Sequence, residues 1–454
     1  MANHENRAIY KIRGHLVCLN QEFLRKPWLA IIVLVLIELL VYLPVFKLDF
    51  QTRWDDQWVA KNLYTEHGLH MDTFRAILTE FYKGQYAPLN QLYYTSLYNF
   101  FGYDPLAFHA AGFVLHALNS LLVFLFIDKL LKFKAFDFVP STAPVAFLSS
   151  LLFAVNPVLV ESVAWIAASK VLIYSLFFLL SLLFYLHYLS SGRYFYFLFS
   201  LLAFVLSFGG KEQAVMLPLS LILLDYISGR KFNRWGVWLE KLPLMLLSLF
   251  FGYLTMLSQA VEGAGVLSHQ PDYPFYQRVV FACYALTEYI TKCLLPVNLS
   301  YLYPFPNQIG EPMPLRFWLY PLAILAGLLI AWGHRKNKWF LFVLMFFVFN
   351  ISIVLHIIPI SRYVITADRY VYMSSVAAMF FLVYGAFILV KERPKYRRLL
   401  FWVGAVYLLT LSIYTHNRIS VWENSVTLKM NIRKIIQSRP DYPNLRNKIE
   451  QNKK

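Results

Sequence analysis

Residues 27–46 read PWLAIIVLVLIELLVYLPVF, a run whose only charged side chain is Glu38. A helix needs about 20 mostly apolar residues to cross the hydrocarbon core of a bilayer. The run is too long for the apolar part of a cleaved signal peptide, and no small-residue cleavage site follows it. We therefore expect these residues to form a permanent membrane helix.

The composition extends this interpretation to the whole chain. Of its 454 residues, 59% are hydrophobic, 18% aromatic and only 15% charged, and the mean hydropathy is +0.51. Charged residues make up about a quarter of an ordinary soluble domain. A soluble enzyme and an intrinsically disordered chain are both excluded, and the three cysteines, which form no CxxC pair, do not make a disulfide framework.

Further apolar runs follow the first one along the chain. The long runs lie at 106–127, 168–190, 237–260, 315–333, 339–360, 369–390 and 399–416. Three shorter and almost uncharged runs lie at 142–156, 194–208 and 213–227. We expect an all-α polytopic membrane protein whose bundle has about eleven transmembrane helices, with the short runs packed inside it.

The positive residues behind the net charge of +17 mainly indicate how the chain is oriented in the membrane. The run 275–296 contains three charged residues and ends at Pro296, so we expect it to lie on the outer face without crossing. Twenty Lys and Arg residues then fall in the N-terminus and in short loops on one face, which the positive-inside rule makes cytoplasmic. A crossing at 275–296 would put His334–Lys338 outside, against the rule. We predict that the N-terminus is inside and the C-terminus outside.

This topology divides the chain into three parts. Residues 1–26 form a basic cytoplasmic N-terminus, and residues 417–454 form a basic extracytoplasmic tail. Between them, 27–416 form the membrane domain, with two large outer loops at 47–105 and 261–314. Both loops are rich in Tyr, Trp and Pro, so we expect them to be structured and to lie close to the membrane surface.

Two adjacent carboxylates, Asp55 and Asp56, follow the first span and are flanked by Trp54 and Trp58. Like charges so close raise the pKa of one member, which favours a carboxylate able to take a proton. The pair is therefore a candidate general base for an acceptor group at the outer surface. The alternative is that one of the two only caps a helix that begins near Trp58.

Other polar residues gather at the predicted outer ends of the helices. His109 and His116 are seven residues apart and share a face of the second span. They mark either a functional site or hydrogen bonding between helices. Glu161 and Lys170 follow the Asn156-Pro157 break.

Two further charged groups stand at breaks in the apolar runs. Lys211 and Glu212 interrupt two short runs and should face the protein interior or a water-filled cavity. Arg362, Asp368 and Arg369 precede the tenth span. They form either a cationic site for a phosphate or an internal Arg–Asp pair that pins one helix end.

The order of these motifs resembles the GT-C membrane glycosyltransferases, and within them the transmembrane-and-tetratricopeptide-repeat group of protein O-mannosyltransferases and their bacterial relatives. The resemblance covers residues from about 45 to 425. It is carried by WDD (54–56), FH (108–109), LHALN (115–119), FAVNPVLVESVAW (153–165), GKE (210–212), LPVNL (295–299), DRYVYM (368–373), and Asn417-Arg418 with Trp422.

This resemblance implies that the chain transfers one sugar, with mannose favoured, from a polyprenyl-phosphate carrier to a hydroxyl of a protein or glycan acceptor. Transfer would occur at the extracytoplasmic face, usually with inversion, in a bacterial inner membrane in preference to the endoplasmic reticulum. The family's acidic pair maps onto Asp55 and Asp56. Relatives continue into tetratricopeptide repeats, whereas this sequence stops soon after Pro440, so we expect the acceptor-recognition module to be missing or supplied by a partner.

The candidate site residues fall into three groups. Asp55 and Asp56 are the predicted catalytic pair. The predicted groups that bind the donor phosphate are Lys211, Arg362, Arg369 and Lys170. The predicted substrate-positioning residues are Trp54, His109, Glu161, Glu212 and Asp368.

The chemistry demands no cofactor, although Asp55, Asp56 and Glu212 would suit a divalent metal if they converge. The expected partners are the lipid-linked sugar, the acceptor and the bilayer, and no nucleic acid. A second hypothesis is a transporter or flippase for a lipid-linked glycan, which predicts charges along a membrane-spanning cavity. A third is a non-catalytic assembly subunit, in which Asp55 and Asp56 are dispensable.

Overall fold

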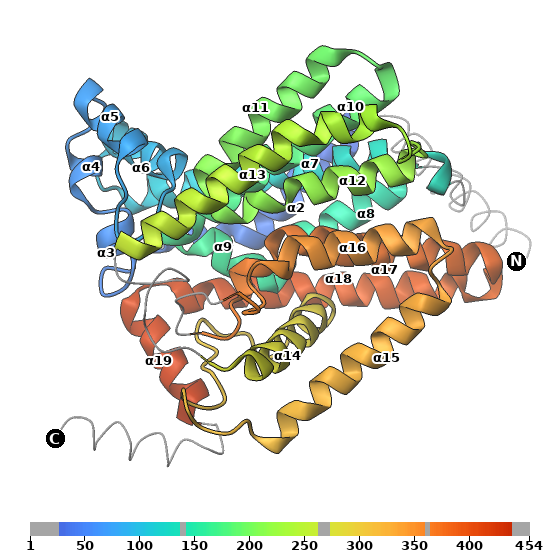
Figure 1. Cartoon of the computed structure of the whole chain (residues 1–454). Coiled ribbons are helices and arrows are strands. Elements are labelled where there is room, and N and C mark those ends of the chain that lie inside the picture. Colours follow the sequence, from blue (N-terminus) through green and yellow to red (C-terminus); the bar gives the residue numbers. More distant parts are fainter. Residues whose placement is uncertain (1–26, 137–141, 262–272, 359–363, 438–454) are drawn as a thin grey trace, which may run out of the picture.

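The chain forms a bundle of helices, shown in Figure 1. The structure is a computed structural model that describes residues 27–136, 142–261, 273–358 and 364–437. Most of these residues lie in helices, and among them the only β-pairing is two isolated bridges. An all-α architecture, as predicted, is confirmed for the part of the chain that is described.

The helices that make up the bundle lie side by side at varying inclinations and alternate in chain direction (Figure 1). They are α2 (Pro27–Tyr42), α7 (Pro105–Leu130), α8 (Thr142–Ala154), α10 (Ser169–Ser191), α11 (Tyr194–Gly210), α12 (Leu217–Ser228), α13 (Trp235–Val261), α15 (Leu319–Gly333), α16 (Lys338–Ser352), α17 (Tyr372–Glu392) and α18 (Arg397–Ile419). The other α-helices are α3 (Asp56–Val59), α4 (Leu63–Glu66), α5 (Met71–Thr79), α6 (Pro88–Phe101), α9 (Val160–Ala164), α14 (Phe275–Leu294) and α19 (Ser425–Gln437).

Seven of the described helical stretches are long and apolar enough to cross a membrane. An eighth is obtained if α8 and the segment Pro157–Ala164, which meet at a bend of 50°, form one broken span. The chain is therefore a multi-pass helical membrane protein, in agreement with the sequence. The count of eleven spans and the orientation stay predictions.

Three of the predicted spans are shorter or more broken than their apolar runs. The run 142–156 ends in the bend after α8. The run 213–227 begins with a 3-10 turn, Glu212–Met216, so that α12 has only 12 residues. The run 339–360 is helical only to Ser352, and its last two residues lie outside the described part. Apolar composition alone therefore overestimated the length of these helices.

The ends of several helices follow from local residue chemistry. Asp104 caps α7, because its side chain accepts a hydrogen bond from the backbone N–H of Leu106 at 3.1 Å, and Pro105 occupies the first helical position. Gly192 and Gly229 end α10 and α12 at φ values of +70° and +79°, a left-handed conformation that glycine adopts without steric cost.

Burial separates the centre of the bundle from its periphery. The α10 stretch lies at the centre and is buried over most of its length, whereas α15 has no buried residue and α13 and α18 expose most of their apolar side chains. Such surfaces suit contact with lipid. The helix α14 contacts both α15 and α17, and it is not among the helices apolar enough to cross a membrane.

One end of the bundle collects most of the segments that carry the predicted site residues. At this end, which we call the site end, α2, α11, α13 and α18 finish and α7, α10 and α17 begin (Figure 1). The helices α3 to α6 and α19 also lie here. Most of the described residues that the sequence singled out are therefore brought to one end by helices that run in alternating directions, whereas His116 lies within the bundle.

Candidate active site

A cavity of about 650 Å³ opens at the site end of the bundle. Its walls come from the loop after α2, the turn before α6, the start of α10, the end of α11, the loop after α14 and the start of α17. Its charged lining residues are Arg53, Lys83, Lys170, Lys211 and Arg369, with Asp55 the one carboxylate among the described lining residues. Its aromatic lining residues are Trp54, Trp58, Trp165, Tyr301 and Tyr370.

The two adjacent carboxylates have different surroundings. Asp55 is half-buried and lines the cavity, and its Oδ1 accepts a hydrogen bond from Trp58 Nε1 at 3.3 Å. Asp56 is buried, and its two oxygens accept from the backbone N–H groups of Gln51 at 2.7 Å and Ala167 at 2.8 Å. Asp55 occupies the N-cap position of α3, as the capping alternative expects, but its side chain makes no capping hydrogen bond.

The surroundings of Asp56 raise the pKa of its side chain. Burial raises its pKa from the usual 3.8 to about 6, and the charge of Asp55 adds a smaller increase, while the two backbone hydrogen bonds oppose it. The sequence predicted that one member of the pair would have a raised pKa. That member is the buried carboxylate, whereas the carboxylate facing the cavity is its neighbour.

Arg369 is fixed at the wall of the cavity by an ion pair and by aromatic rings. Its guanidinium donates to Oε1 of Glu161, which is buried on α9. The guanidinium carbon lies 5.2 Å from the ring centre of Trp165, 5.8 Å from that of Tyr301 and 4.8 Å from that of Tyr370. Glu161 does not line the cavity, so it acts on any ligand only through the position of Arg369.

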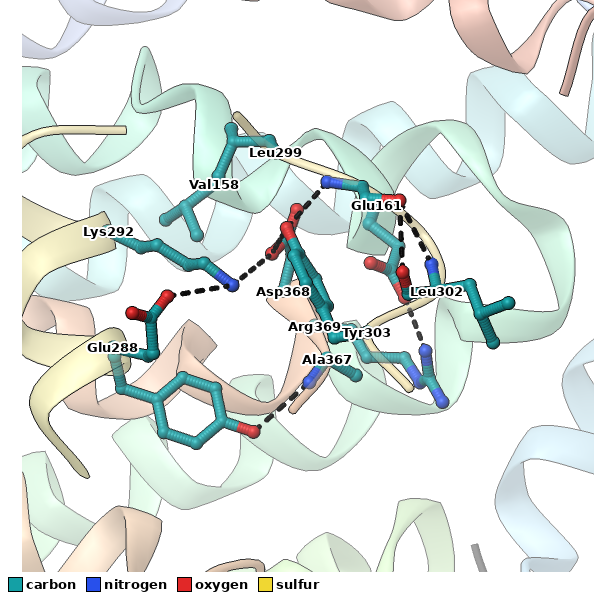
Figure 2. A network of polar contacts seen from close by, with 12 residues as sticks. Val158, Glu161, Glu288, Lys292, Leu299, Leu302, Tyr303, Ala367, Asp368 and Arg369 are labelled. Atoms are coloured by element: carbon teal, nitrogen blue, oxygen red, sulfur yellow. Dashed lines mark hydrogen bonds and ion pairs between the residues drawn. The ribbon is translucent and has the colours of Figure 1, made fainter. Parts of the chain in front are cut away.

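Asp368, the neighbour of Arg369, is the centre of a second buried network, which Figure 2 shows. Its Oδ1 accepts from the hydroxyl of Tyr303 at 2.8 Å, and its Oδ2 accepts from Arg418 Nη2 at 3.1 Å. Lys292 Nζ lies 4.0 Å from Asp368 Oδ1 and 3.7 Å from Glu288 Oε2. The network joins α14, the loop after it, the start of α17 and the end of α18.

Sequence reasoning did not assign a role to these partners of Asp368. In the sequence, Arg418 belongs to the motifs that carry the resemblance and Lys292 is one of the three charged residues of the run 275–296, and neither pattern indicates a contact with Asp368. The alternative that an Arg–Asp pair pins a helix end is realised here, but with Arg418 as the arginine. Arg362, which was grouped with Asp368 and Arg369, lies outside the described residues.

Lys211 and Lys170 reach the cavity from two different helices. Lys211 is buried directly after α11, and its Nζ lies 4.8 Å from the ring centre of Tyr370. Gly210 allows this arrangement, because a Cβ atom there would lie 2.7 Å from the backbone nitrogen of Tyr174 in α10. Lys170 donates to Gln85 Oε1 at 2.8 Å. Three of the four predicted phosphate-binding cations thus line one cavity.

Two other predicted site residues do not line the cavity. His109 is buried in α7, and Glu212 is half-buried behind the cavity lining. Among the described residues, no group of three or more His, Cys, Asp and Glu side chains is arranged to hold a metal ion. The metal set of Asp55, Asp56 and Glu212 considered from the sequence therefore does not assemble.

The second histidine of α7 serves helix packing. His116 Nδ1 lies 2.7 Å from the hydroxyl of Tyr372, and its Nε2 lies 3.0 Å from the carbonyl oxygen of Ala154 and 3.4 Å from Glu38 Oε1. These contacts join α2, α7, α8 and α17. Hydrogen bonding between helices is therefore the role that the structure gives to His116, one of the two alternatives that the sequence left open.

In comparisons with known proteins, no family model and no curated protein sequence matches this chain. The resemblance to the GT-C glycosyltransferases therefore depends on the ordered motifs alone.

Proposed function

We propose that this protein is a membrane glycosyltransferase that moves one sugar from a polyprenyl-phosphate carrier to an acceptor hydroxyl. The observation that carries the proposal is the single cavity in which the carboxylate of Asp55 faces several cations between aromatic walls. Mannose is the sugar favoured by the family resemblance. The product has inverted configuration at the anomeric carbon.

The reaction needs a base for the acceptor, and Asp55 has that role. Its carboxylate takes the proton of the acceptor hydroxyl while the hydroxyl oxygen bonds to the anomeric carbon. The bond from that carbon to the phosphate oxygen breaks, and its electron pair leaves with the polyprenyl phosphate. Asp56 is a positioning residue, because the hydrogen bond from Ala167 ties the loop that carries Asp55 to the turn between α9 and α10, and the bond from Gln51 holds the loop itself.

The leaving phosphate gains negative charge as the bond breaks, so cations around it lower the barrier. Lys211 and Arg369 are the deepest cations of the cavity wall, and Lys170 lies beside them at the start of α10. Arg369 is already oriented by Glu161, so little reorganisation is needed when the phosphate binds. The aromatic walls, with Trp54, Trp165 and Tyr301 in edge-to-face contact, offer rings against which a sugar can pack.

The proposed topology supports this chemistry. In this topology α14 stays at the surface and the eleven helices of the bundle cross in alternating directions, so that the positive-inside rule assigns the site end to the extracytoplasmic side. A lipid-linked donor reaches this end through the bilayer, and an acceptor reaches it from the aqueous phase. A bacterial inner membrane is the location that the resemblance favours.

The test is sugar transfer by the purified protein in lipid nanodiscs, with radiolabelled polyprenyl-phosphate mannose and hydroxyl-rich peptides or short oligosaccharides as acceptors. Asp55→Asn should lower the transfer rate by a factor of about 100 or more, because a general base contributes about 10²- to 10⁴-fold. Asp72→Asn is the matched control, since Asp72 is an exposed carboxylate of the neighbouring helix α5. It should transfer at the wild-type rate.

Two outcomes would contradict the proposal. Wild-type rates in Asp55→Asn would remove the general base. If no acceptor is glycosylated, but labelled lipid-linked glycan crosses the membrane of proteoliposomes, then the transporter hypothesis is correct.

A further inference from the structure

The cations of the cavity form two groups that differ in exposure. Lys211 and Arg369 are buried or nearly so, whereas Arg53 and Lys83 are exposed at the mouth. A phosphodiester-linked sugar brings one negative charge, and the deep cations are placed to receive it. Among the described residues, no acidic side chain forms an ion pair with Arg53 or Lys83, so positive charge remains at the mouth.

The helix α19 extends this positive surface away from the cavity. The Ser425 hydroxyl at its start accepts a hydrogen bond from the backbone N–H of Arg53 at 3.2 Å. Lys429 Nζ, one turn further, lies 5.8 Å from the ring centre of Trp54, which lines the cavity. Arg433 and Lys434 follow and are exposed. We call Arg53, Lys83, Lys429, Arg433 and Lys434 the basic rim.

The carboxylates near this surface are Asp55, which lines the cavity, the exposed Glu80, three residues before Lys83, and the pair Asp49 and Glu423. Asp49 and Glu423 are exposed and adjacent, since the backbone N–H of Asp49 donates to the carbonyl oxygen of Glu423 at 2.9 Å. Both precede α19, whose own residues Ser425–Gln437 include no Asp or Glu. Leu428 and Ile432 are buried against the protein, so the helix is held in place by an apolar face and presents its cations outward.

We propose that the acceptor is an acidic polypeptide segment that lies along the basic rim and places a serine or threonine hydroxyl in the cavity. This inference rests on the proposed function, because it names the acceptor of the same site. Electrostatic complementarity at a rim raises the rate of encounter and selects partners of the opposite charge. An acidic segment is therefore favoured over a neutral one of the same length.

The spacing of the rim cations favours a polypeptide. Lys429 and Arg433 are one helical turn apart, about 6 Å along the axis. In an extended peptide, side chains two residues apart lie on the same face and are separated by about 6.6 Å. Alternate acidic residues of an extended segment can thus face successive cations of α19, while the hydroxyl residue continues toward Asp55.

The experiment compares two fluorescent twelve-residue peptides, each with a central threonine, one with alternate glutamates and one with glutamines in their place. Binding to the full-length protein in nanodiscs is measured by fluorescence anisotropy without donor, and sugar transfer is measured with polyprenyl-phosphate mannose. Each exposed ion pair contributes up to about fivefold in affinity. The acidic peptide should therefore bind about tenfold more tightly than the neutral one at low salt, with the difference shrinking as salt is added.

The variants Lys429→Gln, Arg433→Gln and Lys434→Gln, combined in one chain, should reduce this preference to about twofold or less. The control is Lys336→Gln, an exposed lysine in the loop between α15 and α16, and it should keep the full preference. The neutral peptide also serves as an internal control, because its binding does not depend on the rim charges.

Several outcomes would overturn the inference. These are equal binding of the two peptides, an acidic oligosaccharide that binds more tightly than the acidic peptide, or displacement of the peptide by vesicles of anionic lipid. If the acidic peptide binds selectively but no peptide is glycosylated, the basic rim is supported and the proposed glycosyltransferase activity is what fails. Selective binding together with preferred transfer to the acidic peptide supports both.

Discussion

Replacing Asp56 by asparagine tests whether a buried carboxylate holds the loop that carries Asp55. The carboxylate is buried, and its pKa of about 6 lies above the usual 3.8. Between these two values the folded protein keeps a proton that the unfolded chain has lost. The contribution of this group to stability is therefore fully present below pH 4 and is lost as the pH rises through about 6.

The magnitude follows from the size of the shift. A difference of about two pKa units corresponds to about 3 kcal/mol, since one unit is 1.36 kcal/mol. The asparagine variant does not titrate, so it lacks this dependence. Between pH 3 and pH 7, the free energy of unfolding of the wild type should fall by about 3 kcal/mol relative to the variant, because all other groups titrate alike in both.

The assay is unfolding in mixed detergent–SDS micelles, followed by tryptophan fluorescence at several pH values. Sugar transfer at pH 7 should nevertheless be lower in Asp56→Asn, because Gln51 and Ala167 donate to different oxygens of Asp56 and asparagine places an NH2 donor where one of these oxygens accepts. Asp72→Asn, at an exposed position, should match the wild type in both measurements. Parallel stability curves for the wild type and Asp56→Asn would refute the reasoning.

Three other substitutions test the positioning of the cations. Gly210→Ala should lower the free energy of unfolding by about 1 to 3 kcal/mol, because the alanine Cβ would lie 2.7 Å from the backbone of α10. The control Gly252→Ala should change the free energy of unfolding little, because the nearest atom to its Cβ is 3.9 Å away. Glu161→Gln should lower the free energy of unfolding by about 3 kcal/mol, because it leaves the charge of Arg369 buried without its partner. Adding Arg369→Met should recover most of that loss, which a double-mutant cycle measures. Arg418→Gln should lower thermal stability by breaking its bonds to a buried carboxylate and a loop carbonyl, and equal melting temperatures would contradict this.

The predicted phosphate-binding cations could be chosen from the sequence because they lie at breaks or at predicted outer ends of the apolar runs. Charge is expensive inside a membrane protein unless it has a partner or lines a cavity, so Lys170, Lys211 and Arg369 stood out. Their convergence on one cavity was not visible in the sequence. It depends on the direction and packing of α10, α11 and α17, which come from different parts of the chain.

The membrane class was determined by composition, since a bilayer demands long apolar helices whatever their arrangement. The adjacency of Asp55 and Asp56 was also plain in the sequence, but their division of roles was not. Which carboxylate meets solvent depends on two backbone N–H groups, one of them at Ala167, more than 100 positions away. Likewise Arg418 finds Asp368 only because α18 ends beside the start of α17. Chemical identity is a local property of the sequence, whereas burial, pKa and ion pairing depend on contacts between distant segments, and only the tertiary structure decided them.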